Sequence, residues 1–115
     1  MHELSIVEAL IDQVGQELDR AGHQGRVLRL ELSIGRLSGV HSESVRFAYG
    51  LLAPNTRVEN AELVIQEPKA VCCCHACSVR TEIDDLVVQC PCCASSDITI
   101  EGGRELLLQS IEIED

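Results

Sequence analysis

Apolar side chains recur at helical spacing in the first part of the chain. They form one stripe, and most charged and amide side chains lie off it. A period of three to four residues predicts an amphipathic helix with one buried face. Ala21-Gly22 provides an end for this helix, because glycine adopts the left-handed C′ conformation at little cost. The residues of the stripe are Leu4, Val7, Leu10, Ile11, Val14 and Leu18.

The pattern then changes to alternation. Between residues 26 and 34 leucine or isoleucine alternates with mostly polar neighbours, which is typical of a half-buried strand with Leu28, Leu30, Leu32 and Ile34 on one face. Ser42 can cap a second helix, and Glu43 in its first turn complements the helix dipole. We expect that helix to end near Pro54-Asn55 and a short strand to follow at about Leu63 to Gln66.

The composition changes after Ala70. All seven cysteines fall between Cys72 and Cys93, and after Gly102-Gly103 an alternating apolar pattern returns. We interpret this as an insertion in an α+β domain. Residues 1–69 and 102–115 form that domain, with two helices and three strands, and residues 70–101 form a small zinc-ribbon-like insert. The last strand is expected to return to the sheet of the first domain.

The cysteines form two C-x2-C motifs, Cys74-His75-Ala76-Cys77 and Cys90-Pro91-Cys92-Cys93. Twelve residues separate the inner cysteines, and two such turns can close a tetrahedron of thiolates around Zn2+. We therefore predict a closed, structural zinc site at Cys74, Cys77, Cys90 and Cys93. Buried or redox-active thiols and an iron–sulfur cluster are the alternatives.

Three cysteines exceed the four that such a site needs, and they leave its register open. Cys73 with Cys77, or Cys92 in place of Cys93, could compete for the metal. His75 lies between two ligands and would have to displace one of them. Otherwise Cys72, Cys73 and Cys92 are free thiols.

A second set of metal donors lies at the start of the chain. The α-amine of Met1, if it stays free, the amide and imidazole of His2, and the amide or carboxylate of Glu3 could surround one ion. Such nitrogen-rich, planar coordination suits Ni(II) or Cu(II). The spacing alone is weak evidence, because a histidine near a terminus is usually a solvated residue. We read His23 as a surface residue, and His41 as either a helix-flanking surface group or an auxiliary ligand.

Composition and charge narrow the class of protein. The 115 residues allow one domain with a small module, and the net charge of −10 argues against binding nucleic acid through phosphate neutralisation. Phe47 and Tyr49 are too few aromatic platforms for stacking bases. No apolar run approaches the length of a membrane span, and the first residues do not resemble a signal peptide. We expect a cytoplasmic protein with reduced thiols and no membrane association. A homodimer is compatible with these properties.

Taken together, the chain resembles the HypA/HybF family of hydrogenase nickel-maturation proteins. The motifs that carry the resemblance span the whole chain in order: Met1-His2-Glu3-Leu4-Ser5, Ile34-Gly35, both C-x2-C motifs, Gly103-Arg104-Glu105-Leu106 and Ser110-Ile111-Glu112-Ile113-Glu114. The chain departs from the family in its three additional cysteines. It also has Ser78 and Ala94 after the two cysteine motifs, where the family often has glycine.

The resemblance implies a nickel metallochaperone with a nickel domain of two helices on a three-stranded sheet and an inserted zinc domain. Ni(II) would bind at Met1, His2 and Glu3, and zinc at Cys74, Cys77, Cys90 and Cys93. The implied partners are a maturation GTPase that itself binds nickel and the large subunit of [NiFe]-hydrogenase, and some relatives also support urease. The rival hypothesis is a zinc-ribbon adaptor between proteins with no transported metal. We find no nucleophile–base pair or phosphate-binding loop, and we expect no enzymatic activity.

Overall fold

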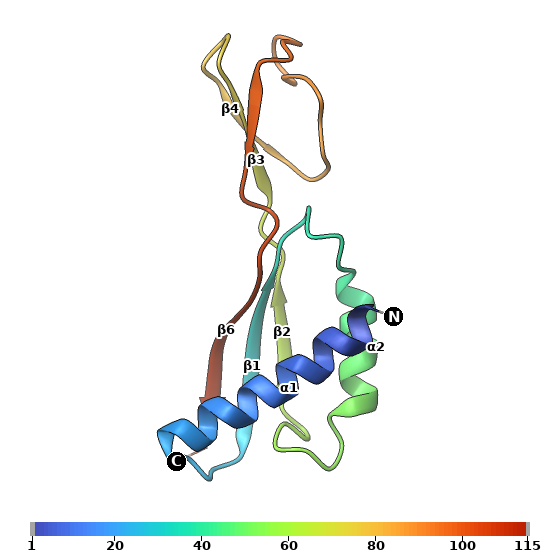
Figure 1. Cartoon of the computed structure of the whole chain (residues 1–115), viewed down its shortest axis with the longest axis vertical. Helices are drawn as coiled ribbons and strands as arrows, with labels where there is room; N and C mark the ends of the chain where they lie inside the picture. Colours follow the sequence, from blue (N-terminus) through green and yellow to red (C-terminus); the bar gives the residue numbers. More distant parts are fainter. Residues whose placement is uncertain (1, 115) are drawn as a thin grey trace. The chain divides into compact units, whose positions relative to one another are not determined.

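The part of the chain that the structure describes contains two helices and six strands, joined by loops and turns. The structure is a computed structural model and describes residues 2–114, with side chains from Glu3 onward. It divides into two compact units, one containing residues up to Leu32, Val40–Ile65 and residues from Leu107 onward, the other Ser33–Gly39 and Gln66–Leu106. In chain order (Figure 1) the elements are α1 (His2–Ala21), β1 (Val27–Ile34), α2 (Ser42–Leu52), β2 (Glu62–Gln66), β3 (Ala70–Cys74), β4 (Arg80–Ile83), β5 (Ile98–Glu101) and β6 (Leu106–Ile113).

Helix α1 forms and ends as its pattern predicts. Val7, Leu10, Val14 and Leu18 of the predicted stripe are all buried. At the C-terminus Gly22 has a φ of 72°. The His23 N–H donates to the Leu18 carbonyl at 2.9 Å, which together with the Gly22 N–H bond to the Asp19 carbonyl makes a Schellman motif. No helix within residues 2–114 combines the length and the apolar character needed to cross a membrane.

A three-stranded sheet with the order β2-β1-β6 lies beside the two helices (Figure 1). The strand at the end of the chain therefore returns to pair with β1, as predicted. Leu30, Leu32 and Ile34 of β1 are buried, in agreement with their alternation, but Leu28 is 39% exposed and Val27 is buried instead. The α+β class with two helices and this sheet is confirmed.

Helix α2 begins with a different cap from the one predicted. The His41 carbonyl accepts the first helical hydrogen bond, from the Val45 N–H at 3.0 Å. His41 is thus the N-cap, with extended backbone angles and no capping hydrogen bond from its side chain, and Ser42 is the first helical residue. The cap prediction was wrong by one residue. The buried face of α2 carries Val45, Ala48 and Tyr49.

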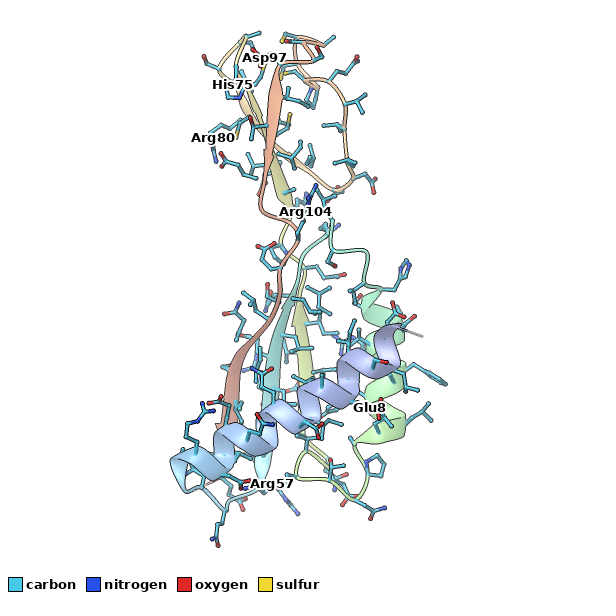
Figure 2. All side chains as sticks on the ribbon, viewed as in Figure 1. Glu8, Arg57, His75, Arg80, Asp97 and Arg104 are labelled. Atoms are coloured by element: carbon cyan, nitrogen blue, oxygen red, sulfur yellow. The ribbon has the colours of Figure 1, made fainter. Side chains whose placement is uncertain are left out.

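Tyr49 fastens the segment that follows α2. Its hydroxyl lies 3.2 Å from the carbonyl oxygens of both Val58 and Ala61, to which it can donate. Burial raises the pKa of this phenol to about 12. On the same segment Arg57 (Figure 2) forms an ion pair of 2.6 Å with Asp19 near the end of α1. The loop between α2 and β2 is therefore held by hydrogen bonds as well as by apolar contacts.

The second unit contains its own antiparallel sheet, in the order β4-β3-β5. Cys72 on the central strand lies opposite Thr81 of β4 and Ile100 of β5. The buried apolar cluster of the second unit is small and consists of Ala70, Cys72 and Ile83. The partly buried residues that pack against the cluster are Leu37, Val87, Ile98 and Ile100.

The second unit is broader than the 70–101 segment expected from the sequence. Residues 33–39 belong to it, because Leu37 packs on its apolar cluster and donates its N–H to the Gly103 carbonyl at 2.6 Å. Gly35 lies so close to the Gly103 backbone that a Cβ atom would collide with it. This contact joins residues far apart in the sequence, and composition gave no sign of it.

Candidate metal centre

The first cysteine turn begins at the last residue of β3. The Cys74 N–H donates to the Val79 carbonyl at 3.1 Å, and the Ser78 N–H donates to the Cys74 carbonyl at 3.1 Å. Inside this closed loop the Cys77 N–H points at the Cys74 sulfur, 3.4 Å away. The backbone thus holds both sulfurs on one side of the turn and directs a donor at the first of them.

The second cysteine turn repeats this hydrogen-bond pattern residue for residue. The Cys90 N–H donates to the Ser95 carbonyl at 2.8 Å, and the Ala94 N–H donates to the Cys90 carbonyl at 2.9 Å. The amides of Cys92 and Cys93 donate to the Cys90 sulfur at 3.3 and 3.5 Å. Two short motifs without other similarity in sequence therefore fold into the same local structure.

Both turns end in a residue with left-handed backbone. Ser78 has a φ of 66° and Ala94 a φ of 64°. A side chain is disfavoured in this conformation, and glycine adopts it without steric cost. In the family that the chain resembles, glycine often follows each cysteine motif, where this chain has Ser78 and Ala94. The positive φ at both positions explains that preference for glycine.

The two turns bring four sulfurs together. The Sγ atoms of Cys74, Cys77, Cys90 and Cys93 all lie within 4.8 Å of one another. Cys74 and Cys93 are 3.5 Å apart, and Cys77 and Cys90 are 3.7 Å apart. A tetrahedral zinc ion with Zn–S bonds of about 2.3 Å needs sulfur–sulfur separations of about 3.8 Å. The donor set and its spacing fit such an ion.

The same hydrogen bonds shift the pKa values of the thiols. The Cys93 amide, more than any other group, lowers the pKa of Cys90 to about 6 against the opposing effect of burial. The Cys77 amide likewise lowers the pKa of Cys74. At Cys77 the Val79 amide has the largest single effect and lowers the pKa, but the hydrogen bond with the Cys74 sulfur and burial together outweigh it and raise the pKa. The first cysteine of each turn is therefore predisposed to be a thiolate, the form that binds metal.

The three surplus cysteines lie outside this group of four among the described residues. Cys72 is buried in the apolar cluster of the second unit. Cys73 accepts a hydrogen bond of 3.1 Å from the Arg80 guanidinium, and burial raises its pKa. Cys92 is exposed, with its sulfur 4.0 Å from the Thr81 hydroxyl. All seven cysteines are free of disulfides.

His75 does not join the sulfurs, although it lies between two of them in sequence. Its Nε2 atom is 2.7 Å from the Thr99 hydroxyl, and its N–H donates to the Asp97 carbonyl at 2.9 Å. Figure 2 labels His75 and Asp97 close together, and Arg80 at the start of β4. The imidazole thus helps to fasten the first turn to β5.

The predicted N-terminal site is described only in part. Met1 and the side chain of His2 lie outside what the structure describes, and Glu3 lies in the first turn of α1. Oε2 of Glu3 accepts a hydrogen bond of 3.4 Å from the N–H of His41, the N-cap of α2. Sequence reasoning singled out the side chain of His41, whereas the structure brings its backbone to Glu3. The sequence carries no signal for this contact, because every residue other than proline has a backbone N–H.

These features define a class: a small α+β protein with four clustered cysteines that could hold a metal ion and a carboxylate held near the start of the chain. A family model described as "Hydrogenase/urease nickel incorporation, metallochaperone, hypA" matches residues 1–113. The chain therefore belongs to the HypA family of hydrogenase maturation factors. Members of this family are metallochaperones rather than enzymes, as predicted.

Individual relatives agree with this assignment over nearly their full length. The hydrogenase maturation factor HypA of Chlorobium limicola is 42% identical over 115 residues, covering 100% of this chain and 98% of the relative. That of Chlorobaculum parvum is 40% identical over 114 residues, covering 99% and 100%. The solution structure of the Ni metallochaperone HypA from Helicobacter pylori is similar with a TM-score of 0.65 at 25% identity, covering 96% of each chain.

Proposed function

We propose that this protein carries Ni(II) at its N-terminus and delivers it during hydrogenase maturation. The ligands are the α-amine of Met1, the amide and imidazole of His2, and Glu3. The observation that carries the proposal is the family match, which begins at residue 1 and so includes these three residues. The His41 N–H adds support, because it holds the Glu3 carboxylate at one place beside α2.

Delivery requires partners that accept the ion. We propose a nickel-binding GTPase as the partner in transfer and the large subunit of [NiFe]-hydrogenase as the destination, both in the cytoplasm. A terminal site with few ligands suits transfer, since a partner can replace those ligands one at a time. The protein itself then breaks no covalent bond.

We propose that the four thiolates of Cys74, Cys77, Cys90 and Cys93 hold a structural zinc ion. When bound, the ion cross-links the two cysteine turns and has no open position for water. Metal analysis of protein purified under reducing conditions should give about one zinc per chain. Iron with acid-labile sulfide in place of zinc would instead indicate an iron–sulfur cluster, and no metal at all would overturn the assignment.

Calorimetric titration of the zinc-loaded protein with Ni(II) tests the carrier function. We expect one nickel site that is lost in His2→Ala and in a variant extended by a few residues before Met1, and retained in His23→Ala, whose loop lies elsewhere. Affinity should fall as the pH drops through about 6.5, because only neutral imidazole coordinates a metal. If both N-terminal variants bind nickel like the parent, the zinc-ribbon adaptor becomes the better hypothesis.

A further inference from the structure

A groove runs between the first turn of α1 and α2, entirely within the first unit. Its cavity volume is about 300 Å³. Leu4, Phe47, Ala48 and Leu51 provide its apolar lining, and Glu3 and Glu43 are its two charged residues. The groove therefore combines an apolar surface with carboxylates, and one of these belongs to the nickel site proposed above.

Two large apolar side chains of this groove are left in solvent. Phe47, the single phenylalanine of the chain, is 68% exposed, and Leu51 is 61% exposed. They are four residues apart on α2 and hence neighbours on one face of the helix. The core is served by other residues of α2, namely Val45, Ala48 and Tyr49. Exposed apolar side chains that the core does not need, gathered at a groove, are typical of an interaction site.

Charge selects the kind of partner. No lysine or arginine is among the described residues that line the groove, and the whole chain carries a net charge of −10. A second copy of this chain has the same net negative charge, and like charges oppose association. A cationic partner would instead be attracted from a distance and oriented on arrival.

We propose that this groove is the docking site for an amphipathic helix of the protein that exchanges nickel with this chain. The helix places apolar side chains one turn apart on Phe47 and Leu51, and a lysine or arginine against Glu43. This inference rests on the proposed function. Because the groove begins at Glu3, a helix seated in it lies beside the nickel ligands, where transfer between the two proteins takes place.

The experiment measures binding of the purified nickel-binding maturation GTPase by biolayer interferometry. Phe47→Gln and Leu51→Gln keep helix propensity and remove the apolar contact, and each should raise Kd about ten-fold or more. Leu107→Gln is the matched control, because Leu107 is 53% exposed on β6, outside the groove. Glu43→Gln should slow association and reduce its dependence on salt, whereas Glu112→Gln, on β6, should not.

Equal Kd values for the parent, Phe47→Gln and Leu51→Gln would overturn the docking site, and so would a loss of equal size in Leu107→Gln. Absence of binding by the parent would overturn both the docking site and the GTPase as partner. Nickel titration of each variant separates these failures from failure of the carrier function, because Phe47 and Leu51 are not proposed ligands and their variants should bind nickel like the parent. Synthetic peptides matching each helix of the GTPase, titrated into isotope-labelled protein, would then identify the helix that docks.

Discussion

In the first unit the side chains of α1, α2 and the β2-β1-β6 sheet bury one another, whereas the buried apolar cluster described in the second unit consists of Ala70, Cys72 and Ile83. The second unit has about 50 residues, too few for a large core, since a domain of about 60 residues buries only about 60% of the surface that its unfolded chain exposes. The zinc proposed at its four clustered sulfurs would compensate, because metal binding can supply the free energy of folding. On this proposal, apolar burial stabilises the first unit and metal binding stabilises the second.

Removal of the metal should have the largest effect and should separate the two units. Structural zinc contributes about 10 kcal/mol or more to the folding of small domains. Treatment with a chelator should therefore collapse the dispersed amide signals of β3, β4 and β5, and leave those of α1 and β1 in place. The measurement is a two-dimensional 15N–1H spectrum recorded before and after chelation.

Single cysteine variants provide the controls for this prediction. Cys90→Ser removes a proposed ligand and should reproduce the chelator's effect without any chelator. Cys92→Ser, two residues away, changes an exposed thiol outside the group of four and should leave the spectrum folded. If the second unit keeps its dispersion after chelation, its small apolar cluster is sufficient and the comparison between the units fails.

The two units also differ in how much of their structure the sequence predicted. In the first unit, helical spacing from Leu4 to Leu18 and alternation in β1 identify the buried faces, because those signals are local. In the second unit, C-x2-C spacing predicted which residues the structure now gathers. The sequence could not predict that Leu37 packs on the apolar cluster of this unit, because Leu37 and Gly103 are far apart in the sequence and the fold brings them together.

The candidate sites show the same limit. The residue types and their spacing pointed to Cys74, Cys77, Cys90 and Cys93, and the structure brings their sulfurs within 4.8 Å. By contrast, no pattern in residues 1–41 shows that the His41 amide meets Glu3, because that depends on how α1 packs against α2. Backbone donors have no signature in a sequence, since every residue other than proline carries one.

Tyr49→Phe should have a moderate effect confined to the first unit. It leaves the carbonyls of Val58 and Ala61 without the hydroxyl donor, and one such hydrogen bond contributes about 0.5–1.5 kcal/mol. Because burial raises the pKa of the folded phenol to about 12, its contribution is complete below the ordinary value near 10 and declines as the pH rises toward 12.

Urea denaturation at several alkaline pH values, followed by the helical circular dichroism signal, tests this prediction. The parent should lose stability between about pH 10 and 12 more steeply than Tyr49→Phe, which has no phenol to ionise. A difference between parent and variant that stays constant over that range would show that Tyr49 is not held neutral by burial.

The smallest expected change in stability comes from substituting the residue with left-handed backbone in a cysteine turn. Ala94 has a φ of 64°, so Ala94→Gly should stabilise the metal-loaded unit by about 0.5–1 kcal/mol through relief of backbone strain. Ala76→Gly is the matched control: Ala76 is not among the described residues with positive φ, so glycine there only adds freedom to the unfolded chain and should destabilise the unit. Both variants leave every sulfur in place, and urea midpoints from the amide signals of β3 and β5 compare their stabilities.

A gain in stability from Ala94→Gly and a loss from Ala76→Gly would show that the turn, as well as the metal, determines how firmly the sulfurs are held. Shifts in the same direction would contradict the left-handed turn, because glycine would then act only through the unfolded state.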